Sequence, residues 1–146
     1  MYDRIGVVGA GLMGSEIALV FALSGRRVRL NDTREELISQ ALKRLEGVLQ
    51  KGIDRGFYEP DVIERTMPLI TPCHSLTDFA DSDLVVEAVF ENEDVKGEIF
   101  SQLDTIAATG CVFASNTSSI SITALASKVS EKRRECFIGT HFFSRV

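Results

Sequence analysis

Closely spaced glycines that interrupt an apolar run near the start of the chain constrain its fold more than any other feature. Residues 5–8 read IGVV and are followed by Gly9, Gly11 and Gly14, while residues 12–23 (LMGSEIALVFAL) are largely apolar. A buried strand, a tight turn and a helix that stops near Gly25 account for this order, because glycine marks both turns and helix ends. The start of the chain therefore predicts a strand–turn–helix unit.

The rest of the chain continues this alternation of strand-like and helix-like segments. Further strands are expected at residues 27–32, 67–73, 83–90, 111–115 and 136–143, and further helices at residues 34–52, 60–66, 93–107 and 122–128. Alternating strands and helices predict a mainly parallel sheet with helices on both faces. Residues 1–146 are therefore expected to form one α/β domain.

The two longest predicted helices after the first carry more detailed expectations. The helix at residues 34–52 should bury one apolar face, which consists of Leu37, Ala41, Leu45, Val48 and Leu49. Asp32 or Thr33 is expected to cap this helix, and Asn92 the helix at residues 93–107.

The charge balance argues against binding to nucleic acids or anionic membranes. Sixteen Lys and Arg against 21 Asp and Glu give a net charge of −5, whereas such binders depend on clustered positive charge. A local basic pocket is compatible with this balance. No apolar run approaches transmembrane length, and the Gly-rich start does not resemble a signal peptide.

The cysteines indicate neither a disulfide framework nor a zinc site. Cys73, Cys111 and Cys136 are odd in number and share no CxxC spacing, so no metal ligand is predicted. Free thiols fit a reducing compartment. We therefore expect a cytoplasmic protein.

The glycines at positions 9, 11 and 14 also have the spacing of a dinucleotide-binding turn. Gly9 would allow the tight turn, Gly11 the close approach of a pyrophosphate, and Gly14 the packing of helix on strand. Asp32, at the end of the next strand, could accept hydrogen bonds from a ribose and repel a 2′-phosphate, which favours NAD over NADP; the nearby Arg34 weakens this preference. The alternative is a purely structural turn with an Asp helix cap. The context favours a Rossmann-type, doubly wound domain.

Three further groups of polar residues follow predicted strands. Glu91 and Lys96 flank one strand–helix junction, where they could face a cofactor or form a solvated surface pair. The small polar residues at 115–119 (SNTSS) could place hydroxyls beside a cofactor or simply cap a helix. His141 is expected at the same sheet edge, as a functional or a structural histidine, and His74 on the surface.

With these elements in order, the chain resembles the nucleotide-binding domain of the L-3-hydroxyacyl-CoA dehydrogenases, enzymes of fatty-acid β-oxidation and related butyrate-type pathways. The matching blocks are GVVGAGLMGSEIA, DLVVEAVFENEDVKGEIF, FASNTSSISIT and GTHFFS, which span nearly the whole chain. The resemblance implies an oxidoreductase that interconverts (3S)-3-hydroxyacyl-CoA and 3-oxoacyl-CoA with NAD.

The resemblance also implies roles for particular residues. His141 matches the catalytic general base and acid, and Ser118 matches a serine that contacts both the cofactor and the substrate's 3-oxygen. Lys51 loosely matches a lysine that meets the CoA phosphates. The implied NAD contacts are Gly9, Ala10, Gly11, Leu12, Met13, Gly14, Asp32, Glu91, Lys96, Ser118 and Ser144.

Two features depart from the family pattern. Arg145 stands where the family has proline. The glutamate that orients the family's histidine, and the helical C-terminal domain that completes the substrate cleft and the homodimer, would lie beyond Val146. We therefore expect this chain to be weakly active or inactive alone. The alternatives are a non-catalytic, NAD-responsive binding module and a related NAD-dependent hydroxy-acid dehydrogenase.

Replacing Asp32 by Ala is expected to weaken NAD binding more than NADP binding, since the carboxylate predicted to bind the ribose and repel a 2′-phosphate is lost. Calorimetric titrations with NADH and with NADPH measure the two affinities. Unchanged discrimination between the two cofactors would contradict the ribose assignment.

Overall fold

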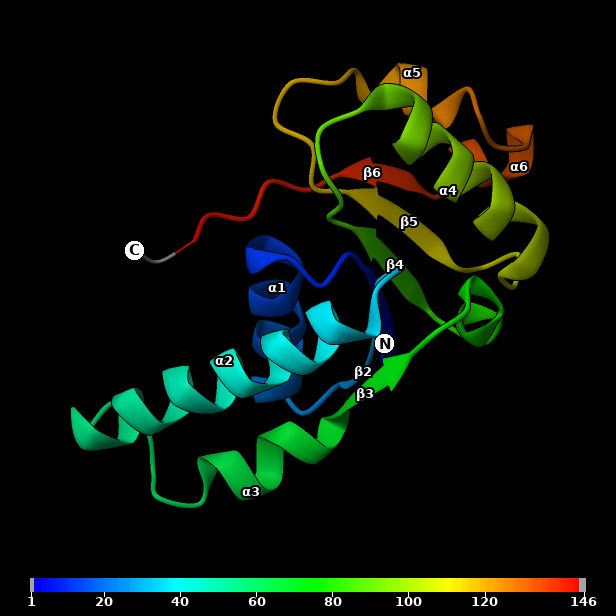
Figure 1. Ribbon diagram of the computed structural model, residues 1–146. Helices are drawn as coiled ribbons and strands as arrows, with labels where there is room; N and C mark the ends of the chain where they lie inside the picture. The colour runs from blue at the N-terminus through cyan, green and yellow to red at the C-terminus, as the bar shows by residue number, and fades with distance from the viewer. Residues whose placement is uncertain (1, 145–146) are drawn as a thin grey trace.

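The computed structural model describes residues 2–144, in which six strands form one parallel sheet of order β3-β2-β1-β4-β5-β6 (Figure 1). The strands are β1 (Arg4–Val8), β2 (Arg27–Asn31), β3 (Ile70–Cys73), β4 (Leu84–Glu87), β5 (Val112–Ser115) and β6 (Phe137–Gly139). The helices are α1 (Leu12–Leu23), α2 (Glu35–Asp54), α3 (Val62–Thr66), α4 (Glu93–Ile106), α5 (Ile122–Ala126) and α6 (Glu131–Arg134), with the short 3₁₀ helices η1 (Met67–Leu69) and η2 (Leu76–Phe79). This strand order confirms the predicted Rossmann-type, doubly wound fold.

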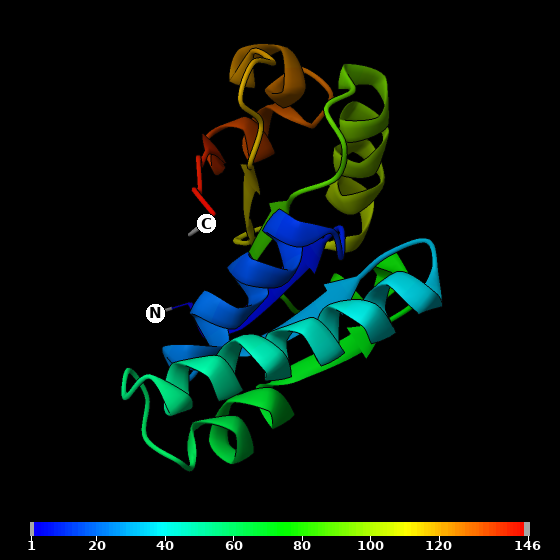
Figure 2. The ribbon, with the colours of Figure 1, turned by 60° about the vertical axis from the view of Figure 1, so that its left-hand side comes forward.

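Helices cover both faces of the sheet and enclose two apolar cores (Figure 2). One core lies against α1, α2 and α3, and the other lies against α4 and α5. Neighbouring strand residues alternate between them: Val7 and Val86 face the first core, while Val8 and Val85 face the second. This alternation follows from the pleat, which points successive side chains to opposite faces.

Several predicted boundaries change in the structure. The strand expected at residues 83–90 ends at Glu87, and Phe90 is 68% exposed. The strand expected at 136–143 is confined to Phe137–Gly139, so that His141 lies in the segment after it. Residues 67–69 form η1 instead of a strand, and α6 was not predicted. The errors lie mostly at element ends, where tertiary contacts override local pattern.

The capping predictions were partly wrong. Asn92 does cap α4, because its side chain accepts from the Val95 N–H at 3.0 Å. The residue at the start of α2 is Arg34, and within the described chain no side chain caps that helix. Ser121 caps α5, so the residues at 115–119 do not have the capping role considered for them. Val48, expected on the buried face of α2, is 44% exposed.

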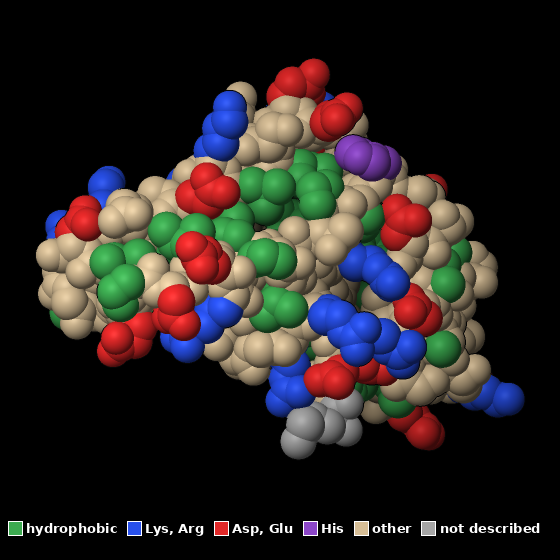
Figure 3. Space-filling view, turned by 90° about the horizontal axis from the view of Figure 1, so that it is seen from below, with side chains coloured by type: hydrophobic (Ala, Val, Ile, Leu, Met, Phe, Trp, Pro, Cys, Tyr) green, Lys and Arg blue, Asp and Glu red, His purple; other side chains and the backbone are tan. Residues whose placement is uncertain are grey.

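Charged side chains of both signs mix over the surface. The face in Figure 3 carries basic side chains beside acidic ones, and Arg26, for example, pairs with Asp3 at 2.6 Å. In the part of the chain that the structure describes, no helix is both long and apolar enough to cross a membrane, and no group of three His, Cys, Asp or Glu side chains could hold a metal ion. Arg145, the departure from the family proline, lies outside the described residues.

The glycine turn between β1 and α1 is closed by backbone contacts that exclude side chains. Gly9 has φ +106°, and a Cβ there would lie 2.7 Å from the Ala88 carbonyl oxygen. A Cβ at Gly14 would lie 1.8 Å from the Gly9 carbonyl oxygen. The predicted roles of these two glycines in the turn and in helix–strand packing are therefore confirmed.

Gly14→Ala is expected to destabilise the domain by roughly 2 kcal/mol or more, since the turn must open to admit a methyl group. Gly47→Ala is the matched control, because no heavy atom among residues 2–144 lies within 4 Å of a Cβ at this position in α2. The control should gain about 0.5–1 kcal/mol from helix propensity. Urea denaturation of both variants measures the difference, and equal midpoints would contradict the close packing at Gly14.

Candidate functional site

Most of the predicted functional residues gather at the edge of the sheet formed by the carboxyl ends of the strands. From β1 the chain builds β2 and β3 on one side and then crosses to β4 on the other, so the strand order reverses between β1 and β4. Ligands of open α/β sheets bind outside the strand ends at such a reversal. Gly9 follows β1 there, Asp32 follows β2, and Glu91 lies beyond β4.

The glycine turn offers an open approach to the start of α1. Gly11 precedes the helix, and among residues 2–144 no side chain caps it and no heavy atom lies within 4 Å of an ideal Cβ at this position. The first N–H groups of α1 are thus available to an anion, as a pyrophosphate requires. Leu12 and Met13 begin this same helix. The residues present fit the diphosphate of a dinucleotide.

Asp32 holds the glycine turn as well as facing the cofactor region. Its Oδ2 accepts a hydrogen bond from the Ala10 N–H at 2.9 Å. Its Oδ1 accepts weaker bonds from the Thr33 hydroxyl and the Arg34 N–H, both at 3.3 Å. The expected capping role is thus replaced largely by a tertiary contact to the turn, and one carboxylate serves both the turn and the adjoining cavity.

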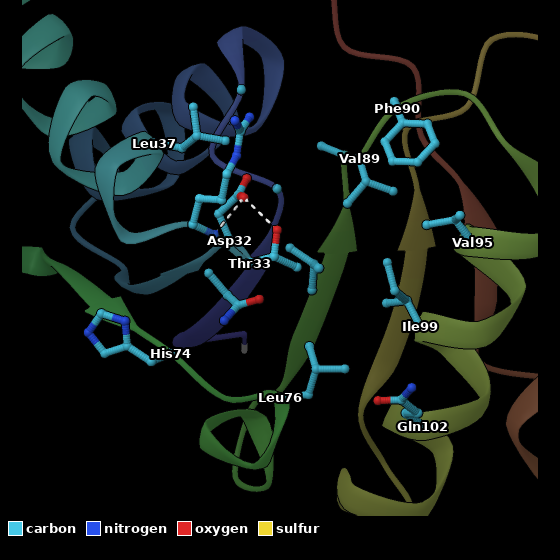
Figure 4. A pocket seen from close by; sticks show the side chains of 16 residues that line it. Asp32, Thr33, Leu37, His74, Leu76, Val89, Phe90, Val95, Ile99 and Gln102 are labelled. Carbon is cyan, nitrogen blue, oxygen red and sulfur yellow. Dashed lines mark hydrogen bonds between the residues drawn. The ribbon is translucent and has the colours of Figure 1, made fainter.

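A cavity of about 660 Å³ opens beside Asp32 (Figure 4). Its volume is typical of small-molecule and cofactor sites. Asp32 lies on one wall, while Val95 and Ile99 of α4 lie on the opposite wall. This combination of a carboxylate and an apolar wall suits the ribose and base of a nucleotide. His74 is exposed, as predicted, but also lines the cavity, which the sequence did not indicate.

Lys96 is buried beside two glutamates, so the surface-pair alternative is wrong. Its side chain is 1% exposed, and that of Glu87 is fully buried. Lys96 Nζ lies 2.7 Å from Glu87 Oε1 and 3.4 Å from Glu91 Oε2, and it donates to the Val89 carbonyl at 3.2 Å. This cluster joins the end of β4 to α4.

Glu91 connects that cluster to the loop after β5. Its Oε1 accepts hydrogen bonds from the N–H groups of Ser118 (3.0 Å) and Ser119 (3.1 Å) and from the hydroxyl of Thr117. Burial alone raises the pKa of Glu91, but the hydrogen bonds from Thr117 and Ser119 and the charge of Lys96 outweigh it and lower the pKa to about 2. Glu91 is therefore held as a carboxylate.

Ser118 and His141 meet at the sheet edge, as their placement after β5 and β6 suggested. Ser118 Oγ lies 2.9 Å from His141 Nε2, and both side chains are exposed. The segment that carries His141 is fixed to β5 and its loop: the Thr140 N–H donates to the Ser115 carbonyl, and the Phe142 N–H donates to Asn116 Oδ1 at 2.8 Å. A hydroxyl and an imidazole thus converge where a substrate oxygen could reach both.

Two other predicted residues lie elsewhere. Ser144 Oγ donates to Glu16 Oε1 of α1 at 3.1 Å, close behind the glycine turn in sequence. Lys51 is exposed in the last turn of α2, at the end of that helix away from β5 and β6 (Figure 1). The structure therefore does not bring Lys51 together with Ser118 and His141.

Glu87 is the residue that sequence reasoning missed. Its Oε1 accepts from the Val89 N–H at 2.7 Å, and its Oε2 accepts from the Ser115 hydroxyl at 2.6 Å. The signal was present: a glutamate within the apolar run DLVVEAVF is expected to be buried and therefore paired.

Comparison with known proteins gives a consistent set of similarities. The family model for the NAD binding domain of 3-hydroxyacyl-CoA dehydrogenase matches residues 4–146. The mitochondrial hydroxyacyl-coenzyme A dehydrogenase of Sus scrofa is 40% identical, over 100% of this chain and 48% of its own length. The fatty acid oxidation complex subunit alpha of Psychrobacter cryohalolentis is 38% identical, over 99% of this chain and 20% of its own length.

Solved structures agree. The 3-hydroxybutyryl-CoA dehydrogenase of Escherichia coli has a TM-score of 0.92 and 34% identity, over 98% of this chain and 30% of that one. The (S)-3-hydroxybutyryl-CoA dehydrogenase of Ralstonia eutropha has a TM-score of 0.92 and 35% identity, over 98% of this chain and 50% of that one. The chain thus spans at most about half the length of these relatives.

Glu91 gives the domain an expected acid sensitivity. Its pKa is lowered from 4.5 to about 2 in the folded state, so its contribution to stability is complete above pH 4.5 and is lost as the pH falls toward 2. Glu91→Gln lacks this titration, and its free energy of unfolding should therefore fall less steeply than that of the unmodified chain across this interval. Urea denaturation at a series of pH values measures the free energy of unfolding of both proteins. Parallel pH dependences would contradict a stabilising contribution from the Glu91 carboxylate.

Proposed function

The chain belongs to the family of NAD-binding domains of the 3-hydroxyacyl-CoA dehydrogenases, and from this membership and the site geometry we propose that it carries both the NAD site and the proton-transfer residues of such an enzyme. The observation that carries the proposal is the 2.9 Å contact between Ser118 Oγ and His141 Nε2, at the same sheet edge as the glycine turn. A domain that only binds NAD needs neither side chain in this arrangement.

The proposed reaction is the oxidation of (3S)-3-hydroxyacyl-CoA to 3-oxoacyl-CoA, or its reverse. When bound, NAD supplies the acceptor for the hydride that leaves the alcohol carbon. His141 Nε2 takes the hydroxyl proton as general base and returns it in the reduction direction. Ser118 Oγ donates a hydrogen bond to the same substrate oxygen and so holds it beside the imidazole. The exposure of both groups leaves room for the substrate.

The remaining binding residues are proposed from the geometry of the site and from the family resemblance. We assign the pyrophosphate to the turn from Gly9 to Gly14, which contains Ala10, Leu12 and Met13, and the adenosine ribose to Asp32. Ser144, bonded to Glu16 of α1, is proposed from the family resemblance to contact the cofactor. From the family resemblance, Lys51 is proposed to meet the CoA phosphates.

The complete enzyme is proposed to need residues outside this chain. Its relatives are about two to five times as long, which supports a further domain. From the family resemblance we propose that this domain is helical, completes the acyl-CoA cleft, supplies a glutamate to His141 and forms a homodimer. We propose that these 146 residues alone are weakly active or inactive. A cytoplasmic location stays a prediction, since some relatives are named as mitochondrial or peroxisomal.

His141→Ala is expected to leave NADH affinity within about twofold and to abolish turnover of 3-hydroxyacyl-CoA in a full-length enzyme, because the proton acceptor is lost while the cofactor contacts stay. His74→Ala serves as the histidine control: because His74 lines the nucleotide cavity, its loss can alter NADH affinity, but turnover at saturating NAD should be retained. NADH titration and a steady-state assay of hydroxyacyl-CoA oxidation provide the two readouts. Persistent turnover in His141→Ala would refute the proton-acceptor role.

A further inference from the structure

One buried polar residue in the cavity beside Asp32 has no role in the function proposed above. Asn31 is the last residue of β2 and lines that cavity, yet only 7% of it is exposed. Strands of a parallel sheet that is covered on both faces are normally apolar, and burying an amide costs free energy unless its polar atoms are paired. An asparagine at this position therefore requires an explanation.

The side-chain amide of Asn31 is held in one orientation by the neighbouring strand. Asn31 and Cys73 are partners in the register of β2 and β3, and Asn31 Nδ2 donates a hydrogen bond to the Cys73 carbonyl oxygen at 3.0 Å. Because a carbonyl oxygen can only accept, the nitrogen end of the amide must face it. The oxygen end, Oδ1, is thereby turned away from the Cys73 carbonyl, and no donor among residues 2–144 is bonded to it.

The other side chains of the cavity leave Asn31 as its buried polar group. Two apolar walls face each other, with Leu37 on the side of Asp32 and with Val95 and Ile99 on the side of α4 (Figure 4). The other polar side chains of the described lining are more exposed than Asn31: Asp32 is half-buried, and Thr33, Arg34, His74 and Gln102 are exposed.

This arrangement fits a flat base that carries a hydrogen-bond donor on its edge. Ligand sites commonly combine apolar walls with a few fixed polar groups that determine specificity. If Asp32 binds the adenosine ribose, the base attached to that ribose lies in the same cavity. Adenine has an amino group at its 6-position, which donates hydrogen bonds. Asn31 Oδ1 is an acceptor that the described chain leaves without a donor.

We propose that Asn31 makes this domain selective for adenine: its Oδ1 accepts a hydrogen bond from the 6-amino group of the base, while the Cys73 carbonyl holds the amide in place. This inference rests on the NAD site proposed above. It assigns to the site a selectivity for the base that neither the glycine turn nor Asp32 provides. A base with an oxygen at the 6-position would present an acceptor to an acceptor, and a buried group left unpaired in this way lowers affinity.

Calorimetric titrations with NADH and with its hypoxanthine analogue test the proposal directly. The analogue has an oxygen in place of the 6-amino group, while its diphosphate, riboses and nicotinamide are those of NADH. The unmodified chain is expected to bind NADH about tenfold more tightly than the analogue. In Asn31→Leu, the affinity for NADH should fall and that for the analogue should change little, so that the two lie within about twofold of each other.

Two other polar side chains of the cavity provide matched controls. His74→Ala and Gln102→Ala each remove one side chain from the lining and leave the amide of Asn31 in place. Each is expected to change the affinities for NADH and for the analogue by the same factor, which preserves the preference for adenine. Loss of the preference in either control, together with its retention in Asn31→Leu, would overturn the assignment to Asn31.

The unmodified protein provides a second readout that does not depend on the folding of Asn31→Leu. In the ¹⁵N-labelled chain, NADH should shift the side-chain amide resonances of Asn31 more than the hypoxanthine analogue does. Equal shifts, or equal affinities for the two dinucleotides, would overturn the proposal and leave the NAD site intact. Failure of the proposed NAD site would look different, since neither dinucleotide would then bind saturably.

Discussion

The buried ion pair between Glu87 and Lys96 is the interaction on which the functional edge of this domain depends. Removing two charges from water costs several kcal/mol per ion, and the cost is recovered only when each charge is fully hydrogen-bonded. Here the partners come from β4, β5, α4 and the segment after β4. The pair therefore forms only when these elements are in register, and loss of one partner would cost about 3–5 kcal/mol.

The strand order places this pair next to the glycine turn. β1 and β4 are neighbours, the Ala88 N–H donates to the Val8 carbonyl at 2.8 Å, and a Cβ on Gly9 would collide with the Ala88 carbonyl oxygen. The nucleotide-binding turn and the segment that leads to Glu91 are thus in direct backbone contact. Close packing at the strand reversal joins the part that fits a cofactor to the part that carries the proposed chemistry.

The sequence predicted the architecture better than the charge network. Alternating strands and helices are local patterns, and so is the glycine spacing, which is why both were predicted correctly. The burial of Lys96 and the role of Glu87 arise from contacts between residues far apart in the chain, for which spacing offers no rule. The same reason explains Asp32, which was expected to cap a helix and instead bonds mainly to the Ala10 N–H, 22 residues earlier.

His141 depends unusually on the Ser118 loop for its orientation. Its backbone is held through the neighbouring Thr140 and Phe142 N–H groups, but within residues 2–144 the only hydrogen bond to its ring is that between Nε2 and Ser118. A catalytic imidazole is commonly oriented through its second nitrogen by a further group. In the part of the chain that the structure describes, the contact with Ser118 is the one that orients the ring, and the Ser118 N–H is in turn bonded to Glu91. The histidine proposed as proton acceptor is therefore linked through Ser118 and Glu91 to the buried ion pair at the end of β4.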